Sequence, residues 1–210
     1  MKLESIRESQ KNSLNQFRLL ICFGIIVAGA TIGVVQKMLD EAMFGDLPGI
    51  LERLDIGNYF GRFAIWILIG TILSVYAKRP LHAAINCFLF FMGMVAGYYV
   101  FCNYVLHFLP TTYMLIWVVV ACLSPFAAAI CWYAKGEGII SVIISAIILG
   151  VLFSQAFLIT QGFYVTHILE VITWVAGVII LYRKPKEFVL EMIISLGVAI
   201  IYQLFIPYWG

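Results

Sequence analysis

Seven continuous apolar runs, most of them about as long as a bilayer is thick, decide what this chain can fold into. A helix needs about 20 apolar residues to cross the hydrocarbon core. The breaks between the runs hold proline, glycine or clustered charge, as helix ends do, whereas transmembrane strands would alternate over about ten residues. The sequence therefore predicts an all-α, polytopic transmembrane bundle with seven spans, at about 17–38, 60–77, 81–107, 113–134, 139–158, 164–182 and 188–205.

The composition agrees with a protein that is surrounded by lipid. Hydrophobic residues make up 63% and charged residues 11% of the 210 positions, whereas soluble domains average about 45–50% and about 25%. A water-soluble fold of this size could not cover so much apolar surface. The net charge of +2 and the lack of a basic cluster predict no nucleic-acid partner. We expect a cytoplasmic segment, 1–16, followed by a single transmembrane domain, 17–210.

The positions of the basic residues set the expected orientation, because Lys and Arg concentrate in cytoplasmic loops. With a cytoplasmic N-terminus, ten of the thirteen Lys and Arg residues lie on that side, and only Lys37, Arg53 and Arg62 lie outside. The C-terminus is then extracytoplasmic, with Tyr208 and Trp209 as interfacial anchors. No cleavable signal peptide is expected, because residues 1–16 are polar.

The longest link between spans, about 39–59, is acidic and is expected on the outer face. Asp46 is predicted to cap a short helix at about 48–55, with Pro48 in its first turn. This helix is expected to lie along the membrane surface, because it has an apolar side formed by Ile50, Leu51 and Leu54.

Two pairs of glycines and five cysteines are predicted to serve helix packing. Gly29-x-x-x-Gly33 and Gly93-x-x-x-Gly97 each form a small-residue face that lets another helix approach closely. All the cysteines fall inside apolar runs without a CxxC pair, so neither a disulfide framework nor a zinc site is indicated; they are Cys22, Cys87, Cys102, Cys122 and Cys131.

Ionisable side chains inside a span are costly and need an explanation. Glu170 is the clearest example, six residues into the sixth predicted span. On a continuous helix, His167 and Trp174 share its face, because they lie three and four residues away. The structural interpretation is one interhelical bond to Glu170, and the functional interpretation is a binding site.

Further polar and aromatic residues gather near the outer ends of the second and third spans. If Arg62 does not simply snorkel to the headgroups, it can meet Glu170 in an outward-facing polar cavity. The substrate-binding residues predicted for this cavity are Arg62, Trp66, Tyr99, Asn103, His107, His167, Glu170 and Trp174. Glu187 and Glu191 are interpreted instead as charge balance for the nearby Arg and Lys residues.

Known catalytic and metal-binding patterns are missing from the sequence. There is no HExxH, GxSxG or P-loop motif. The histidines His82, His107 and His167 are too few for a di-metal site. No catalytic residue, metal or cofactor is therefore predicted.

One stretch resembles a known family. The residues from Ser74 to Asn86 (SVYAKRPLHAAIN), running into Phe88 to Tyr99 (FLFFMGMVAGYY), are similar to a family of small bacterial polytopic membrane proteins of unknown function. The resemblance implies a multi-pass protein of the bacterial cytoplasmic membrane and nothing about its activity.

Three functions are compatible with these features. The first is binding or transport of a small polar solute through the outward-facing cavity. The second is a membrane-embedded enzyme acting on a lipid-linked substrate, with Glu170 as general base, although no nucleophile or metal is identified. The third is a non-catalytic helper or immunity-type subunit. The expected partners are the lipid bilayer and a small-molecule ligand, and a homo-oligomer or a partner subunit is compatible with the sequence.

Overall fold

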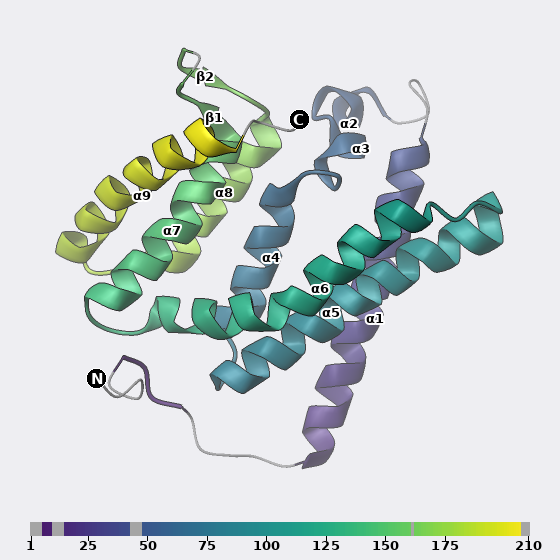
Figure 1. Cartoon of the computed structure of the whole chain (residues 1–210), viewed down its shortest axis with the longest axis horizontal. Coiled ribbons are helices and arrows are strands. Elements are labelled where there is room, and N and C mark those ends of the chain that lie inside the picture. Colours follow the sequence, from purple (N-terminus) through teal and green to yellow (C-terminus); the bar gives the residue numbers. More distant parts are fainter. Residues whose placement is uncertain (1–5, 10–14, 43–47, 161, 207–210) are drawn as a thin grey trace.

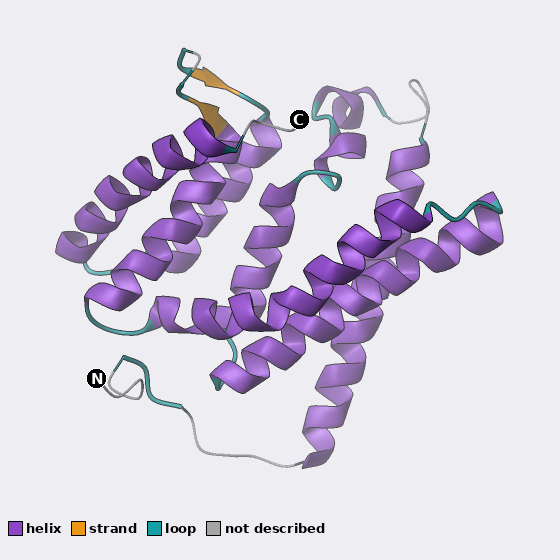
Figure 2. Ribbon diagram, in the orientation of Figure 1, coloured by secondary structure: helices purple, strands orange, loops and turns teal. Residues whose placement is uncertain are grey.

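The computed structural model describes residues 6–9, 15–42, 48–160 and 162–206. Helices make up most of this part of the chain (Figures 1 and 2). They are α1 (Asn15–Glu41), α2 (Gly49–Arg53), α3 (Ile56–Tyr59), α4 (Phe63–Val75), α5 (Pro80–Phe101), α6 (Thr111–Cys131), α7 (Ile139–Ala156), α8 (Ile168–Leu181) and α9 (Pro185–Phe205). A π-helical turn, η2 (Cys102–Leu106), continues α5, and a 3₁₀ turn, η3 (Trp132–Lys135), continues α6. A small antiparallel hairpin pairs β1 (Phe157–Leu158) with β2 (Tyr164–Val165).

Five of the described helices are long and apolar enough to cross a membrane: α1, α5, α6, α7 and α9. Two shorter apolar helices, α4 and α8, fall in the remaining predicted runs. Large apolar side chains point outward on these helices; Phe126 is 69% exposed and Ile179 is 70% exposed. Such surfaces fit a lipid environment, because lipid does not penalise exposed apolar area as water does. The fold is therefore all-helical and compatible with a multi-pass membrane protein.

The second, fifth and sixth predicted runs differ from the helices that form there. The fifth was expected to reach residue 158, but α7 ends at Ala156, and Phe157 and Leu158 form β1. The sixth was expected to begin at Tyr164, but Tyr164 and Val165 pair in the hairpin, and α8 begins only at Ile168. The second was expected from residue 60, but Arg62 is extended, and α4 begins at Phe63. Hydrophobicity identifies these segments as apolar, but it cannot distinguish a helical turn from a strand or an extended residue within an apolar segment.

The long helices form two groups with α4 between them. In the first group α5 packs along both α1 and α6, and in the second α7 packs along both α8 and α9. Helix α4 contacts α5 and α6 on one side and α7 and α8 on the other, as Figure 1 shows. Helices α2, α3 and the hairpin lie at one end of the molecule, called here the α3 end. Residues 6–9 lie at the other, called the Arg7 end (Figure 1).

The tightest packing is between α1 and α5, as the glycine pattern predicted. A Cβ atom on Gly29 or Gly33 would overlap the carbonyl oxygen of Phe90 or Met94 on α5. In return, Gly93 and Gly97 lie against carbonyls of α1. Both small-residue faces are thus used within one chain, where they let two backbones touch.

The link after α1 contains the short helix that the sequence predicted around 48–55. It is α2, which is shorter than predicted and ends at Arg53, and Pro48 precedes its first turn. Helix α3 begins three residues after α2 ends, at Ile56. The position of α2 along the membrane surface stays a prediction. The proposed cap Asp46 and the proposed anchors Tyr208 and Trp209 lie outside the described residues.

Candidate functional site

The centre of the candidate site is a buried ion pair between α4 and α8. The Nε atom of Arg62 donates a hydrogen bond to Oε1 of Glu170. Both residues are largely removed from the surface, with 7% of Arg62 and 1% of Glu170 exposed. Sequence spacing had placed these two residues near one level, and the structure brings them into direct contact.

The local backbone explains how the two side chains meet. Arg62 and His167 are the extended residues that immediately precede α4 and α8. Glu170 therefore lies in the first turn of α8, not six residues deep in a span as the sequence analysis expected. The first turn of a helix favours a negative charge, because its unpaired N–H groups give it a partial positive charge. Helix position and Arg62 together stabilise the buried carboxylate.

Asp55 completes the charge network from the α2–α3 link. Its Oδ2 lies 2.5 Å from Nη1 of Arg62 and 3.7 Å from Nδ1 of His167. Burial raises the pKa of Asp55, but hydrogen bonds from Arg62 and Asn58 outweigh burial, so this pKa lies below its ordinary value. Asp55 also has a positive φ of 55°, a conformation that Asp adopts more readily than most residues.

A hydrogen bond beside this network joins α8 to α3. The hydroxyls of Tyr59 and Thr173 lie 2.5 Å apart in a buried contact between α3 and α8. We call Asp55, Tyr59, Arg62, Glu170 and Thr173 the clasp. The clasp holds α8 of the second helix group to the α3–α4 segment at the α3 end.

The clasp leaves some of its buried polar atoms without a protein partner. Among the described residues, Nη2 of Arg62 and Oε2 of Glu170 have no hydrogen-bond partner, and neither does Nε1 of Trp174. The ring of Trp174 packs against Phe153 and Phe157. One donor and one acceptor of the charged pair thus stay free to bind water or a polar group.

The other predicted site residues are dispersed. Asn103 and His107 are exposed, in and just after the turn η2 that continues α5. The hydrogen bonds of Arg62 go to Glu170 and Asp55, not to these two residues. Tyr99 is buried beside a very small second cavity. Trp66 is 4% exposed, and its indole donates to the carbonyl of Phe60 over 2.9 Å. Among the described residues, Arg62 and Glu170 line neither this small cavity nor the larger one described next, and the polar cavity around them stays a prediction.

A cavity of about 370 Å³ lies instead between α4, α5 and α6, with Ile148 of α7 at its edge. Neither Arg62 nor Glu170 lines it, whereas Trp66 does. Its walls are mainly apolar and aromatic, and they include no charged side chain. The volume falls within the range of about 300–1,000 Å³ that is usual for small-molecule sites.

A second buried charged pair lies at the Arg7 end, where the sequence analysis expected only interfacial charge balance. Arg183 donates to the carbonyl of Gly136 and to Oγ of Ser141, at 3.0 and 2.7 Å. Its Nε lies 3.7 Å from Oε2 of Glu191, and Glu191 is 0% exposed. The four-residue step from Glu187 to Glu191 places both on one helix face, but only the fold shows that Glu191 points inward.

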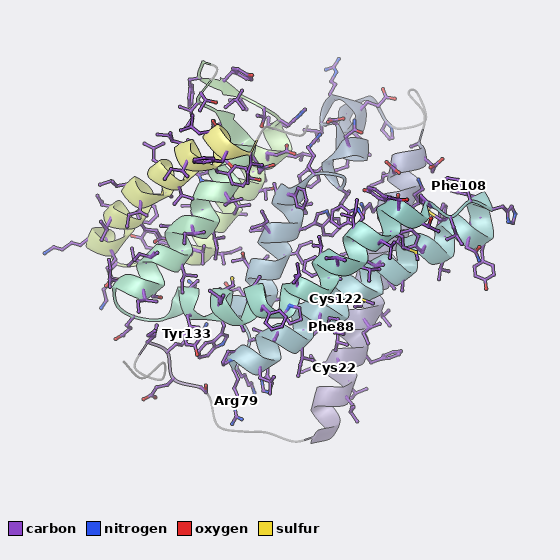
Figure 3. The ribbon with its side chains drawn as sticks, in the orientation of Figure 1. Cys22, Arg79, Phe88, Phe108, Cys122 and Tyr133 are labelled. Atoms are coloured by element: carbon purple, nitrogen blue, oxygen red, sulfur yellow. The ribbon has the colours of Figure 1, made fainter. Side chains whose placement is uncertain are left out.

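Arg7 also closes a contact that the sequence did not indicate. Its guanidinium donates to the carbonyls of Trp132 and Val75, over 2.6 and 2.8 Å, and it stacks 4.3 Å from the centre of the Trp132 ring. The neighbouring Ile6 is 6% exposed. The side-chain view places Tyr133 and Arg79 toward the same end of the molecule (Figure 3).

No group of three or more His, Cys, Asp or Glu side chains in the described residues is placed to hold a metal ion. All five cysteines are free. Cys87 and Cys131 line the large cavity.

The helices and the cavity define an all-helical protein whose apolar surfaces fit a bilayer and whose polar contacts hold two helix groups together. Residues 12–208 match the Family of unknown function (DUF6518). The chain belongs to that family. No match was found among curated proteins or among solved structures.

Proposed function

We propose that this protein crosses the bacterial cytoplasmic membrane several times and binds or transports a small solute where α4 packs against the first helix group. The observation that carries the proposal is the cavity of about 370 Å³ between α4, α5 and α6. Spaces between the helices of a bundle are a common location for ligands in helical proteins.

In this proposal the clasp has a gating role. Arg62 and Glu170 join α4 to α8 at the α3 end, so the helix groups cannot separate there without breaking the pair. Exposing both charges to water compensates for the broken contact, which makes such a pair suitable for a contact that opens and closes. The residues predicted to bind a polar solute are thus divided between a gate, with Arg62 and Glu170, and a cavity wall, with Trp66.

The proposal is tested by ligand-dependent stability. The purified protein in detergent would be unfolded by heat in the presence of a panel of small cationic, neutral and anionic solutes. A solute that binds the folded state at 100 times its Kd raises the free energy of unfolding by about 2.7 kcal/mol. Replacing Ala128, which is 4% exposed and lines the cavity, by Leu should remove this effect.

Val119→Leu provides the matched control, because Val119 lies on the same helix and is 55% exposed. It should keep the full stabilisation. If the solutes that stabilise the protein act equally on Ala128→Leu, the cavity is not their binding site. Uptake of a stabilising solute into proteoliposomes then separates transport from binding alone.

A further inference from the structure

The cavity has a consistent electrostatic character, although no charged side chain lines it. Four aromatic residues from three helices line it: Phe63, Trp66, Phe91 and Trp117. Phe63 and Trp117 have ring centres 5.8 Å apart, and Trp66 and Phe91 have ring centres 6.5 Å apart. The face of an aromatic ring carries partial negative charge and attracts cations.

The hydroxyl groups of the cavity walls also favour a positively charged ligand. Thr71 donates its proton to the carbonyl of Ile67 at 2.8 Å. Ser74 donates to Gly70 at 2.6 Å, and Ser124 donates to Ala121 at 2.8 Å. A hydroxyl that already donates has only lone pairs left to offer. These three side chains can therefore accept hydrogen bonds from a ligand but not donate to it.

A cation of the chain itself, Arg7, binds to residues that directly follow two residues of the cavity wall, although Arg7 does not line the cavity. Ser74 and Cys131 line the cavity, and the residues that follow them, Val75 and Trp132, provide the carbonyls that bind Arg7. Helix α4 ends at Val75, whereas α6 continues after Cys131 into the 3₁₀ turn η3. The C-terminal ends of helices carry partial negative charge. The chain thus binds a guanidinium at residues adjacent to the cavity wall, through carbonyls and an indole face.

We propose that the cavity binds an organic cation with an apolar body. In this proposal the Arg7 side chain, a cation that belongs to the chain itself, closes the cavity on the side of residues 74 and 131. This inference rests on the proposed function and names its ligand class. Aromatic rings, lone pairs and the C-terminal end of α4 all favour positive charge. An anion such as a carboxylate would find no positive side chain in these walls.

The test uses the alkylation rate of Cys131 as a reporter, in a variant whose other four cysteines are replaced by Ala. N-ethylmaleimide is applied to the purified protein with benzyltrimethylammonium or with its uncharged carbon isostere, neopentylbenzene. The two probes have nearly the same shape, so they differ only in charge. We expect saturable protection by the ammonium, with an affinity about tenfold higher than that of the isostere.

Each result has a defined meaning. Equal or stronger protection by neopentylbenzene overturns the cation preference but keeps the cavity as a binding site. Protection by neither probe overturns the proposed function for this cavity as well. If Cys131 does not react at all, thermal unfolding of the wild-type chain with the same two probes replaces the alkylation assay.

Two variants locate the preference. Trp117→Leu should abolish the tenfold difference between the probes, whereas Phe126→Leu should not, because Phe126 lies on the same helix but is 69% exposed. Arg7→Ala should raise the affinity for the ammonium several-fold and leave that for neopentylbenzene unchanged. An unchanged ammonium affinity in Arg7→Ala would show that Arg7 does not close the cavity.

Discussion

At the scale of single residues, a buried charge is stabilised by several favourable interactions at once. Glu170 has an arginine partner and a position in the first turn of α8. Arg62 is shared between Glu170 and Asp55, so its one positive charge faces two carboxylates. Removing one member of a buried pair is strongly destabilising, because the remaining charge loses both its partner and its water.

Glu170→Gln should destabilise the protein by about 1–3 kcal/mol, because Arg62 loses one of its two carboxylate partners and keeps Asp55. Unfolding in mixed micelles with denaturant measures the change. Arg53→Gln is the control, since Arg53 is exposed on α2, and it should change stability by less than about 0.5 kcal/mol. The double variant Arg62→Met, Glu170→Met should recover stability relative to Glu170→Gln, because it buries neither charge. A double variant that is less stable than the single one would contradict this explanation.

The pH dependence of the clasp follows from Asp55. Its pKa is lowered from 3.8 in the folded protein, so its contribution to stability is complete above that value and is lost as the pH falls through the folded pKa. The difference in Tm between the wild type and Asp55→Asn should be largest near neutral pH and should shrink in acid. Both proteins should carry His167→Gln, so that the histidine facing Asp55 does not contribute to the comparison. A difference that grows in acid would show that Asp55 is destabilising when charged.

At the scale of elements, the α1–α5 contact depends on the absence of side chains. Gly33 and Gly97 place the backbone of one helix against carbonyl oxygens of the other. This close approach makes many small attractive contacts, and no adjustment of a flexible side chain can relieve a clash with backbone atoms.

Gly33→Ala should destabilise the protein by about 1–3 kcal/mol, because the new Cβ overlaps the carbonyl of Met94. Gly24→Ala on the same helix is the matched control, since nothing lies within 4 Å of its Cβ position. This control should stabilise the helix by roughly 0.5–1 kcal/mol, as Ala is the better helix former. Thermal unfolding of the two variants compares them directly. Equal effects of the two substitutions would mean that α1 does not pack on α5 so closely.

At the scale of the whole molecule, contacts join distant parts of the sequence at each end. Arg7 reaches the ends of α4 and α6, and Arg183 reaches the turn before α7. Arg62 and Glu170 join α4 to α8 of the second helix group at the α3 end. Basic side chains from several segments thus lie at the Arg7 end. The predicted orientation needs such clustering, because it places these segments together on the cytoplasmic side.

Reporter fusions test the orientation. Alkaline phosphatase fused after Gly210 should be active, because we expect the C-terminus outside. The same enzyme inserted in the turn at 136–138 should be inactive, and green fluorescent protein there should be fluorescent. A C-terminal fusion that is active only with a cytoplasmic reporter would reverse the predicted number or direction of the spans.

Several features of this protein follow from local sequence alone. Each of the seven apolar runs contains a helix. A long apolar segment in lipid has no water to bond its backbone, so its N–H and C=O groups must bond to each other. The Gly29 and Gly33 face could be identified as a contact surface from its spacing. Glu170 and Arg62 could be selected because isolated charges between apolar runs are costly wherever they lie.

Other features were decided only by the tertiary structure. Composition could not show that residues 164–165 form a hairpin strand, and so Glu170 was placed too deep. It also could not show that Glu191 points inward or that Arg7 docks on Val75 and Trp132. Local patterns determine which segments are helical, since helix hydrogen bonds join residues four apart. Which side chains meet, and where a cavity remains, depends on how helices distant in sequence pack, and no local pattern carries that information.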